Sequence, residues 1–272
     1  MTDFVPKIGI LAGGGRAPFE LIRACCDQGR PFFVIGIKGQ VDEDLPVDKA
    51  LDFGAFGAFK KICERENITE LVMLGRVHRP SITEIRPDFL GLKVLAKIGL
   101  NARGDDSVLR AVAQAIESEC GVRVVGAHEV VEDLLMSEGV LTKVKPSEQV
   151  YKDIVRGLEV ARGLGALDVG QAVVVQQGVV LGVEAVEGTD ALIQRASELK
   201  RRGGGGVLVK CSKPQQDPRF DLPTLGPDTI RALAAAGFAG VAMEAGKGLF
   251  IDRAATIRLA DEEELFVVGM NA

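Results

Sequence analysis

The chain has 272 residues, 47% of them hydrophobic and 26% charged, a balance that is typical of globular proteins and excludes wholesale disorder. Its net charge of −5, without a basic stripe, argues against a nucleic-acid partner. The length favours two modest domains over one large domain. Five cysteines without a C-x-x-C pair indicate reduced thiols and a cytoplasmic location.

Strands and helices alternate in the first half of the chain, beginning with a strand. The expected elements are, in order, 7–12, 18–28, 32–37, 55–67, 70–74, 105–120 and 122–126. Alternation of this kind predicts βαβ units with right-handed crossovers and a parallel sheet. We therefore expect an α/β protein with a Rossmann-like N-terminal domain over residues 1–140.

The second half has a different pattern and begins after a polar, Pro-containing linker expected over 141–152. Two strands over 172–175 and 179–185 are expected to form a hairpin that turns at Gln177-Gly178. A helix is expected to begin near residue 189, with Thr189 or Asp190 as its N-cap. The other expected elements are helices over 153–164 and 228–236 and strands over 207–210, 241–244 and 266–268. These elements predict a C-terminal mixed α/β domain over 153–272.

Three glycines, Gly13, Gly14 and Gly15, follow the first strand and precede a helix. Backbone N–H groups in such a turn form an anion site. The dinucleotide fingerprint requires a further glycine where Pro18 stands, and Lys38 follows the second strand in place of an acidic ribose ligand. These departures oppose an NAD(P) site. A phosphate or nucleotide site and a purely structural turn remain equal alternatives.

A second loop with phosphate-binding potential follows the strand over 70–74. It contains Gly75, Arg76 and Arg79, and arginine suits bidentate phosphate contacts. Loops at the carboxyl ends of parallel strands share one edge of the sheet, so we favour phosphate binding over a solvated basic loop. The two histidines, His78 and His128, form no zinc motif.

Carboxylates gather in two parts of the second half. Glu184, Glu187 and Asp190 flank a strand-to-helix turn, whereas Asp217 and Asp221 lie in a Pro-rich loop. Carboxylates combined with phosphate oxygens and water suit Mg²⁺, and nearby cations would offset pyrophosphate charge. The alternative is a salt-bridged loop that stabilises the domain. The basic residues beside these carboxylates are Lys210, Lys213 and Arg219.

Several sequence strings resemble one protein family. D-V-G-Q from Asp168, E-G-T-D from Glu187 and R-F-D-L-P from Arg219 are similar to the LpxI-type UDP-2,3-diacylglucosamine pyrophosphatases. In the first half L-A-G-G-G from Leu11, G-R-V from Gly75 and G-D-D from Gly104 occur in matching order. The resemblance covers nearly the whole chain.

The resemblance implies Mg²⁺-dependent hydrolysis of UDP-2,3-diacylglucosamine to UMP and 2,3-diacylglucosamine 1-phosphate, in lipid A biosynthesis. It also implies two domains that close over the acylated UDP-sugar, a homodimer, and peripheral contact with the cytoplasmic face of the inner membrane. Two other functions stay open, an NAD(P)-dependent oxidoreductase and a non-catalytic protein that binds a nucleotide sugar or lipid phosphate.

The resemblance and the residue chemistry together suggest roles in catalysis. We expect Asp221 to be a metal ligand or to orient water, assisted by Asp217 or Glu187. Asp217 and Asp190 are the further expected metal ligands. The expected substrate-binding residues are Gly13, Gly14, Gly15, Gly75, Arg76, Arg79, Gln171, Thr189, Lys210, Lys213 and Arg219. An amphipathic helix over 89–100 either contacts acyl chains or an anionic membrane, or is an ordinary core helix.

Overall fold

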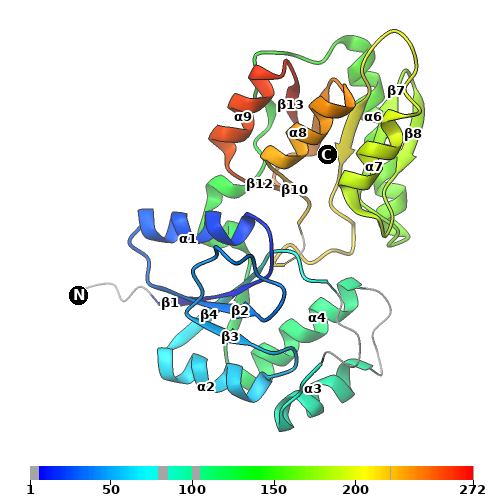
Figure 1. Cartoon of the computed structure of the whole chain (residues 1–272). Helices are drawn as coiled ribbons and strands as arrows, with labels where there is room; N and C mark the ends of the chain where they lie inside the picture. The colour runs from blue at the N-terminus through cyan, green and yellow to red at the C-terminus, as the bar shows by residue number, and fades with distance from the viewer. Residues whose placement is uncertain (1–5, 79–84, 100–104, 221, 272) are drawn as a thin grey trace. The chain divides into compact units, whose positions relative to one another are not determined.

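A computed structural model describes residues 6–78, 85–99, 105–220 and 222–271. The chain divides into two compact units, Met1–Glu132 with Asp217–Asp221, and Asp133–Gln216 with Leu222–Ala272 (Figure 1). The segment 217–221, here termed the strap, belongs to the first unit although its sequence neighbours on both sides belong to the second. The division at 132/133 comes before the expected domain end at 140.

The first unit contains a parallel sheet in the order β3-β2-β1-β4-β5, as a Rossmann-like domain requires. After β1, the chain forms β2 and β3 on one side of it. The chain then returns to form β4 and β5 on the other side of β1. The sequence-based prediction of a parallel α/β domain is therefore confirmed, with β3 as an unexpected edge strand. The strands are β1 (Lys7–Ala12), β2 (Phe32–Ile37), β3 (Lys49–Leu51), β4 (Ile68–Leu74) and β5 (Arg123–Val125).

Helices cover both faces of this sheet (Figure 1). Phe59, Ile62 and Ile116 pack with Leu71 and Val124 in one buried cluster. The expected helix over 105–120 is present, but its last turn is a π-helix that ends at Gly121 in the left-handed conformation. The helical elements are α1 (Ala17–Asp27), α2 (Phe56–Glu66), α3 (Phe89–Gly99), α4 (Asp105–Ala115), the π-turn η1 (Ile116–Cys120) and α5 (Ala127–Val130).

The second unit is built on a mixed sheet in the order β6-β13-β11-β9-β7-β8. β9, β11 and β13 run parallel to one another. β6 pairs antiparallel with β13, and β7 pairs antiparallel with β9. Gln177 and Gly178 turn the expected hairpin with φ of 53° and 75°, which suits a tight hairpin turn. The strands are β6 (Gly139–Val140), β7 (Ala172–Gln176), β8 (Val179–Val183), β9 (Val207–Lys210), β11 (Gly240–Glu244) and β13 (Phe266–Met270), with β10 (Thr224–Leu225) and β12 (Leu249–Phe250) as a separate pair.

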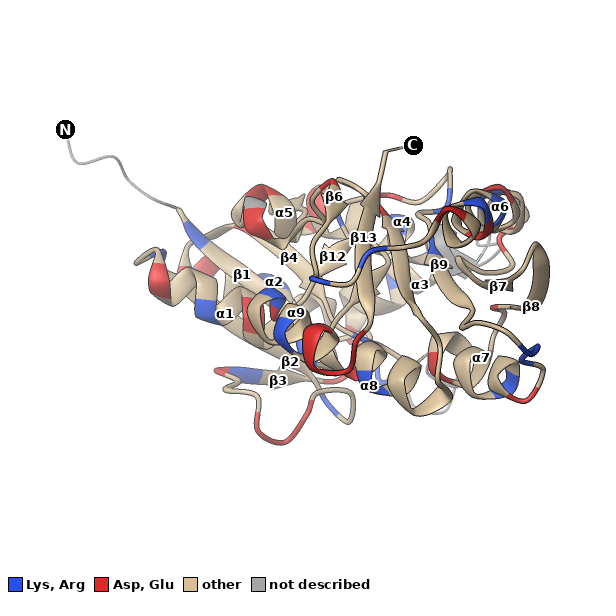
Figure 2. Cartoon of the chain, turned by 90° about the horizontal axis from the view of Figure 1, so that it is seen from above, with Lys and Arg blue, Asp and Glu red and all other residues tan. Residues whose placement is uncertain are grey.

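One helix lies on one face of this mixed sheet and three lie on the other (Figure 2). The single helix is α6 (Glu148–Ala166), and a Cβ at Gly157 would overlap the Val209 side chain, so α6 crosses β9 closely. The opposite face carries α7 (Gly188–Ser197), α8 (Pro227–Ala236) and α9 (Arg253–Glu262), and a short 3-10 turn, η2 (Glu132–Leu134), leads into the unit. Within the described ranges, no helix has the length and apolar character needed to cross a membrane.

Two local expectations in the second unit are wrong. Residues 148–152, assigned to the linker, form the start of α6, because the Ser147 hydroxyl accepts the Val150 N–H at 3.3 Å and caps the helix. The N-cap of α7 is Glu187 rather than Thr189 or Asp190. The Thr189 hydroxyl instead donates to Glu184, which removes it from a capping role.

Candidate active site

Two glycine-rich turns meet at the carboxyl ends of β1 and β4. The Gly14 N–H donates to the Arg76 carbonyl at 2.8 Å, and the Arg76 N–H donates back to the Gly14 carbonyl at 2.7 Å. Gly75 has a φ of +106°, and a Cβ there would lie 2.8 Å from the Gly13 carbonyl carbon, so only glycine fits. The strand order reverses at this point, which is where doubly wound sheets bind ligands.

The amides of the three glycines already have acceptors within this unit. The Gly13 N–H donates to the Leu74 carbonyl at 2.9 Å, and the Gly15 N–H donates to Asp42 Oδ2 at 3.1 Å. A phosphate at Gly15 would have to replace the Asp42 carboxylate, which would otherwise repel it. The exposed Arg76 guanidinium has no hydrogen-bond or ion-pair partner in the part of the chain that the structure describes. The Arg76 guanidinium is therefore unpaired among the described residues at this edge, and its predicted phosphate contact stays a prediction.

A second polar site lies in the mixed sheet, where β8 and β9 end and β7 begins. The strand register places Gln171, Glu184 and Lys210 at neighbouring positions. Glu184 is 6% exposed, and its two oxygens accept the Thr189 hydroxyl at 2.6 Å and the Gln171 N–H at 3.1 Å. The Thr189 hydroxyl and the Gln171 backbone thus bind a buried carboxylate, and Lys210 lies on the same face of the sheet as Glu184.

Lys210 is a buried cation in this second site. Its side chain donates from Nζ to the Thr224 carbonyl at 2.7 Å, and the residue is only 5% exposed. Burial lowers the pKa of Lys210, and the negative charges of Glu184 and Asp190 oppose that shift. A buried ammonium group is costly unless it is paired, so a bound anion would be favoured here. Asp190, in the first turn of α7, is exposed.

The side-chain oxygen of Gln171 is a further sign of a binding site. Gln171 Oε1 is buried and accepts no hydrogen bond from any described residue. Buried polar atoms in native proteins nearly always have a partner.

Beside Lys210, the end of β11 carries charged residues that sequence reasoning missed. Glu244 is 2% exposed, and its Oε1 accepts Arg162 Nε at 3.1 Å and Arg162 Nη2 at 2.8 Å. Its Oε2 accepts the Ser212 N–H at 3.1 Å and the Ser212 hydroxyl at 3.3 Å. Glu244 is the charged last residue of an apolar strand, as Lys210 is in β9. This pattern in the sequence could have indicated Glu244.

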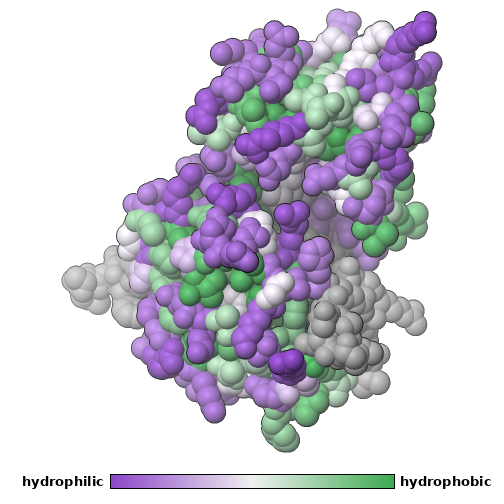
Figure 3. Space-filling model, in the orientation of Figure 1, coloured by the Kyte–Doolittle hydropathy of each residue, from purple (hydrophilic) through white to green (hydrophobic). Residues whose placement is uncertain are grey.

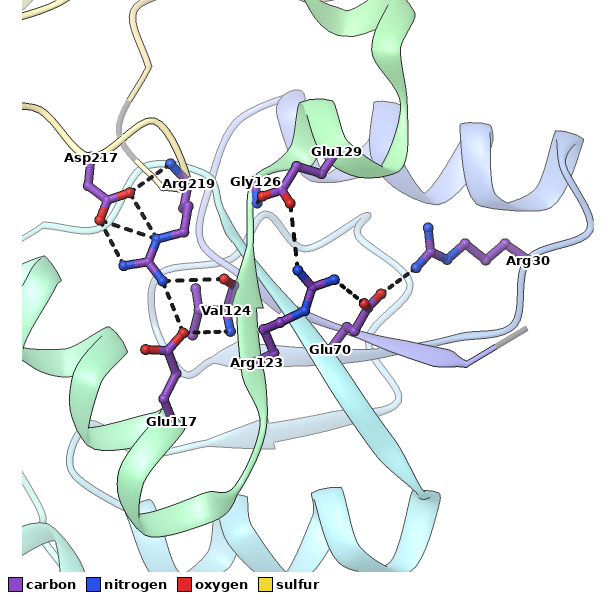
Figure 4. Close-up of polar contacts among 9 residues, drawn as sticks. All are labelled: Arg30, Glu70, Glu117, Arg123, Val124, Gly126, Glu129, Asp217 and Arg219. Atoms are coloured by element: carbon purple, nitrogen blue, oxygen red, sulfur yellow. Dashed lines mark hydrogen bonds and ion pairs between the residues drawn. The ribbon is translucent and has the colours of Figure 1, made fainter. Parts of the chain in front are cut away.

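The strap brings Asp217 and Arg219 into the first unit (Figure 4). Arg219 Nη2 donates to Asp217 Oδ2 at 2.8 Å, and Arg219 Nη1 donates to Glu117 Oε1 at 3.0 Å. The side-chain hydrogen bond from Arg219 holds the pKa of the Asp217 carboxyl below its usual range. Phe220 packs against the buried cluster of α2, β4 and β5.

Both halves of the chain match one protein family. Residues 7–134 match the LpxI N-terminal domain, and residues 137–268 match the LpxI C-terminal domain. The chain belongs to the LpxI family. A curated relative, the UDP-2,3-diacylglucosamine pyrophosphatase LpxI of Caulobacter vibrioides, is 42% identical over 274 residues, covering 97% of this chain and 98% of the relative. The family resemblance of the sequence strings is confirmed.

Other predicted site residues of this LpxI-family chain have ionic partners. Glu187 Oε1 accepts Arg195 Nη2 at 2.6 Å, and Lys213 Nζ donates to Asp168 Oδ1 at 2.8 Å. A hydrogen bond from its own backbone N–H, followed by the one from Arg195, lowers the pKa of Glu187. These ion pairs hold the loop after β8, which contains Glu187, and the loops before β7 and after β9, which contain Asp168 and Lys213. The predicted catalytic and substrate roles of Glu187 and Lys213 stay predictions.

Two predicted residues of this LpxI-family chain, Arg79 and Asp221, lie outside the described residues. Among the described residues no three carboxylate, histidine or cysteine side chains gather as metal ligands. Of the three expected Mg²⁺ ligands, Asp221 is not described, Asp217 has both oxygens bonded to Arg219, and Asp190 is an exposed residue of α7. The described residues therefore do not complete a magnesium site.

Proposed function

We propose that this LpxI-family chain hydrolyses the pyrophosphate of UDP-2,3-diacylglucosamine, giving UMP and 2,3-diacylglucosamine 1-phosphate. Water adds to one phosphorus and the bridging P–O bond breaks, so each product carries one phosphate. Extensive identity to a relative named for this substrate supports the proposal. The observation that carries it is the buried Lys210 beside Glu184, which also binds the Thr189 hydroxyl.

Each of these groups has a task in that reaction. The Lys210 ammonium would neutralise charge on a phosphate, and its burial strengthens this interaction because the local dielectric is low. Gln171 Oε1 would accept a hydrogen bond from the sugar and orient it. Glu184 holds Thr189 and the Gln171 backbone in place. Asp221 would orient the attacking water, and Arg76 would bind a further phosphate oxygen.

The acyl chains require apolar surface, since their burial contributes about 0.8 kcal/mol per CH₂ group. Val169 and Val186 are exposed and flank Glu184 in the second site, at 45% and 104% exposure. We propose that these side chains border the acyl chains. Val186→Asp should then raise KM more for substrates with long acyl chains than for short-chain analogues.

We also propose peripheral contact with the cytoplasmic face of the inner membrane through α3. Phe89 and Leu92 are 90% and 56% exposed, and apolar surface is visible over this helix in Figure 3. Lys93 pairs with Glu119, so apolar contact carries the proposal rather than the lysine charge. Replacing Phe89 and Leu92 with serine should reduce sedimentation with anionic vesicles. Unchanged sedimentation would contradict the proposal.

Two further proposals rest on the family resemblance. Mg²⁺, when bound, would supply a Lewis acid for the phosphate oxygens, with Asp221 among its ligands. Activity should disappear after treatment with a chelator and return on adding Mg²⁺, and activity that survives chelation would remove the ion from the proposal. The chain is also proposed to be a homodimer, which sedimentation equilibrium of the purified protein tests directly.

The first experiment measures UMP release from UDP-2,3-diacylglucosamine in detergent. Lys210→Gln should lower kcat/KM by a hundredfold or more, about 2.7 kcal/mol or more of transition-state stabilisation. The matched control is Lys152→Gln, because Lys152 is an exposed lysine on α6. Tight substrate binding by the native protein without UMP release would favour a binding protein, and neither binding nor release would refute the proposed substrate.

A further inference from the structure

We propose that Arg162 and Lys247 form a binding site for a phosphate group at the carboxyl ends of β9 and β11, with the buried Glu244 holding Arg162 in position. The site lies within the second unit. It is separate from Lys210, because the strand register pairs Lys210 with Met243 and the next residue, Glu244, points to the opposite face of the sheet. It therefore adds a second phosphate site to the one in the proposed function.

The carboxylate of Glu244 is satisfied by two neighbours. Its Oε1 accepts Nε and Nη2 of Arg162, and its Oε2 accepts the backbone N–H and the hydroxyl of Ser212. A buried carboxylate requires such pairing, because an uncompensated charge in the interior is strongly destabilising. The pair of Arg162 and Glu244 is neutral, so the fold needs no further cation at this point.

Lys247 is nevertheless a second cation beside the same carboxylate. Its Nζ lies 3.8 Å from Glu244 Oε1, a distance that fits an ion pair but is too long for a hydrogen bond. The turn after β11 places it there, since the Lys247 N–H donates to the Glu244 carbonyl at 3.3 Å. Arg162 and Lys247 thus oppose one negative charge with two positive charges, while Lys213 and Asp168 nearby form a neutral pair. One positive charge is left uncompensated in this group.

The two cations are accessible, unlike the carboxylate that holds them. The side chains of Arg162 and Lys247 are 42% and 51% exposed, and that of Glu244 is 2% exposed. Glu244 occupies the Nε–Nη2 edge of the guanidinium, and Nη1 donates to no residue in the ranges that the structure describes. The free edge of the guanidinium can therefore bind an anion. Its plane is already fixed, so binding costs less conformational entropy.

The place of these residues in the fold also favours ligand binding. β9 and β11 are parallel neighbours, and Ser212 and Lys247 follow their carboxyl ends. Ligands of α/β sheets bind outside the carboxyl ends of the strands. Arg162 reaches this edge from α6, which lies close against β9 at Gly157. An arginine fork, an ammonium group and excess positive charge suit a phosphate group better than a neutral sugar.

The experiment titrates the full-length protein with inorganic phosphate and follows the NMR shifts of the Ser212 and Lys247 amides, which report on this site alone. Lys247→Gln should raise the Kd for phosphate about tenfold, because one charged contact is lost. The variant should fold normally, since Glu244 keeps all of its hydrogen-bond donors. Arg162→Gln should weaken binding at least as much and also lower the Tm, because Glu244 loses its charged partner.

The matched controls are Arg156→Gln and Lys152→Gln, two exposed cations of α6 that lie outside this group. Both should bind phosphate like the native protein. No saturable shift at Ser212 and Lys247, or an unchanged Kd in Lys247→Gln, would overturn the inference. So would a loss of binding at these amides in Lys210→Gln alone, because the anion would then lie at Lys210.

Titrations with UMP, glucosamine 1-phosphate and uridine identify the source of the phosphate. Tighter binding of UMP supports a site for the nucleotide phosphate, and tighter binding of glucosamine 1-phosphate supports a site for the sugar phosphate. Uridine that binds as tightly as UMP would contradict phosphate recognition. If the native protein released no UMP from UDP-2,3-diacylglucosamine, the proposed function would fail, and the phosphate titration would still support or overturn this site.

Discussion

At the scale of single residues, burial of the Lys210 side chain destabilises the fold but places a cation where it could bind a phosphate. It ends an otherwise apolar strand, and its ammonium group is buried with the Thr224 carbonyl as hydrogen-bond acceptor. Such a group weakens the folded state unless an anion compensates it. A polar residue kept at this cost, beside a buried glutamate, is typical of a binding site.

The pKa of Lys210 predicts the pH dependence of activity. Burial lowers this pKa from its ordinary value of 10.5, so the side chain loses its proton at a lower pH than an exposed lysine. We expect kcat/KM to fall as pH rises through that lowered pKa, because neutral Lys210 no longer attracts phosphate. Stability changes in the opposite direction: the unfolded chain binds more protons in this window, so the free energy of unfolding rises with pH.

The residual activity of Lys210→Gln provides the test of this prediction. Its pH–rate profile should lack the alkaline fall, whereas Lys152→Gln should keep the native profile. The Cys211 thiol, the next residue, has its pKa raised to about 12 by burial and so titrates at higher pH. An alkaline fall that persists in Lys210→Gln would assign the titration to another group.

At the scale of secondary structure elements, one buried carboxylate joins α6 to the β7–β8 hairpin. Asp153 is 2% exposed, and its oxygens accept the Gln177 N–H at 2.8 Å and the Gly178 N–H at 2.7 Å. These amides belong to the tight turn, where no strand partner is in position to accept them. The helix therefore stabilises the turn on which the register of the hairpin depends.

Removing this carboxylate should destabilise the second unit. Asp153→Ala leaves two turn amides unpaired, and we expect the free energy of unfolding to fall by about 2–4 kcal/mol. Asp153→Asn retains one acceptor oxygen and should lose about half as much. Denaturant unfolding measures both, with the exposed Lys152→Ala on the same helix as control. A loss equal to that of the control would show that the turn does not depend on Asp153.

At the scale of the whole molecule, the chain contributes to the first unit from two distant parts of the sequence. The strap lies late in the sequence, yet Phe220 packs with Val124 and the other core residues of the first unit. The stability of the N-terminal sheet thus depends in part on a residue that the family division assigns to the C-terminal domain.

Phe220→Ala should therefore destabilise the first unit selectively. Loss of this partly buried ring should lower the free energy of unfolding of the first unit by about 1–3 kcal/mol, less than for a fully buried phenylalanine. Hydrogen exchange should accelerate in β4 and β5 and stay unchanged in β7, β9 and β11. Acceleration confined to the second unit would contradict the assignment of the strap.

Local sequence patterns were sufficient for most of the architecture. The apolar runs predicted β1, β2 and β9 with their observed bounds, because periodicity and turn residues act over a few positions. They also indicated that the turns after β1 and β4 share one edge of the sheet, where Gly14 pairs with Arg76. The short strands β3, β6, β10 and β12 were missed, because strands of two or three residues carry too little pattern.

The sequence by itself determined the α/β class, the parallel sheet of the first half and the family, because these depend on local periodicity and on strings that are read directly. Only the tertiary structure decided that Glu184 lies beside Lys210, that Glu244 is buried with Arg162 at the end of the neighbouring strand, and that the strap belongs to the first unit. Arg219 and Glu117 are separated by 102 positions. Contacts across such separations depend on how whole elements pack, which no short stretch of sequence specifies.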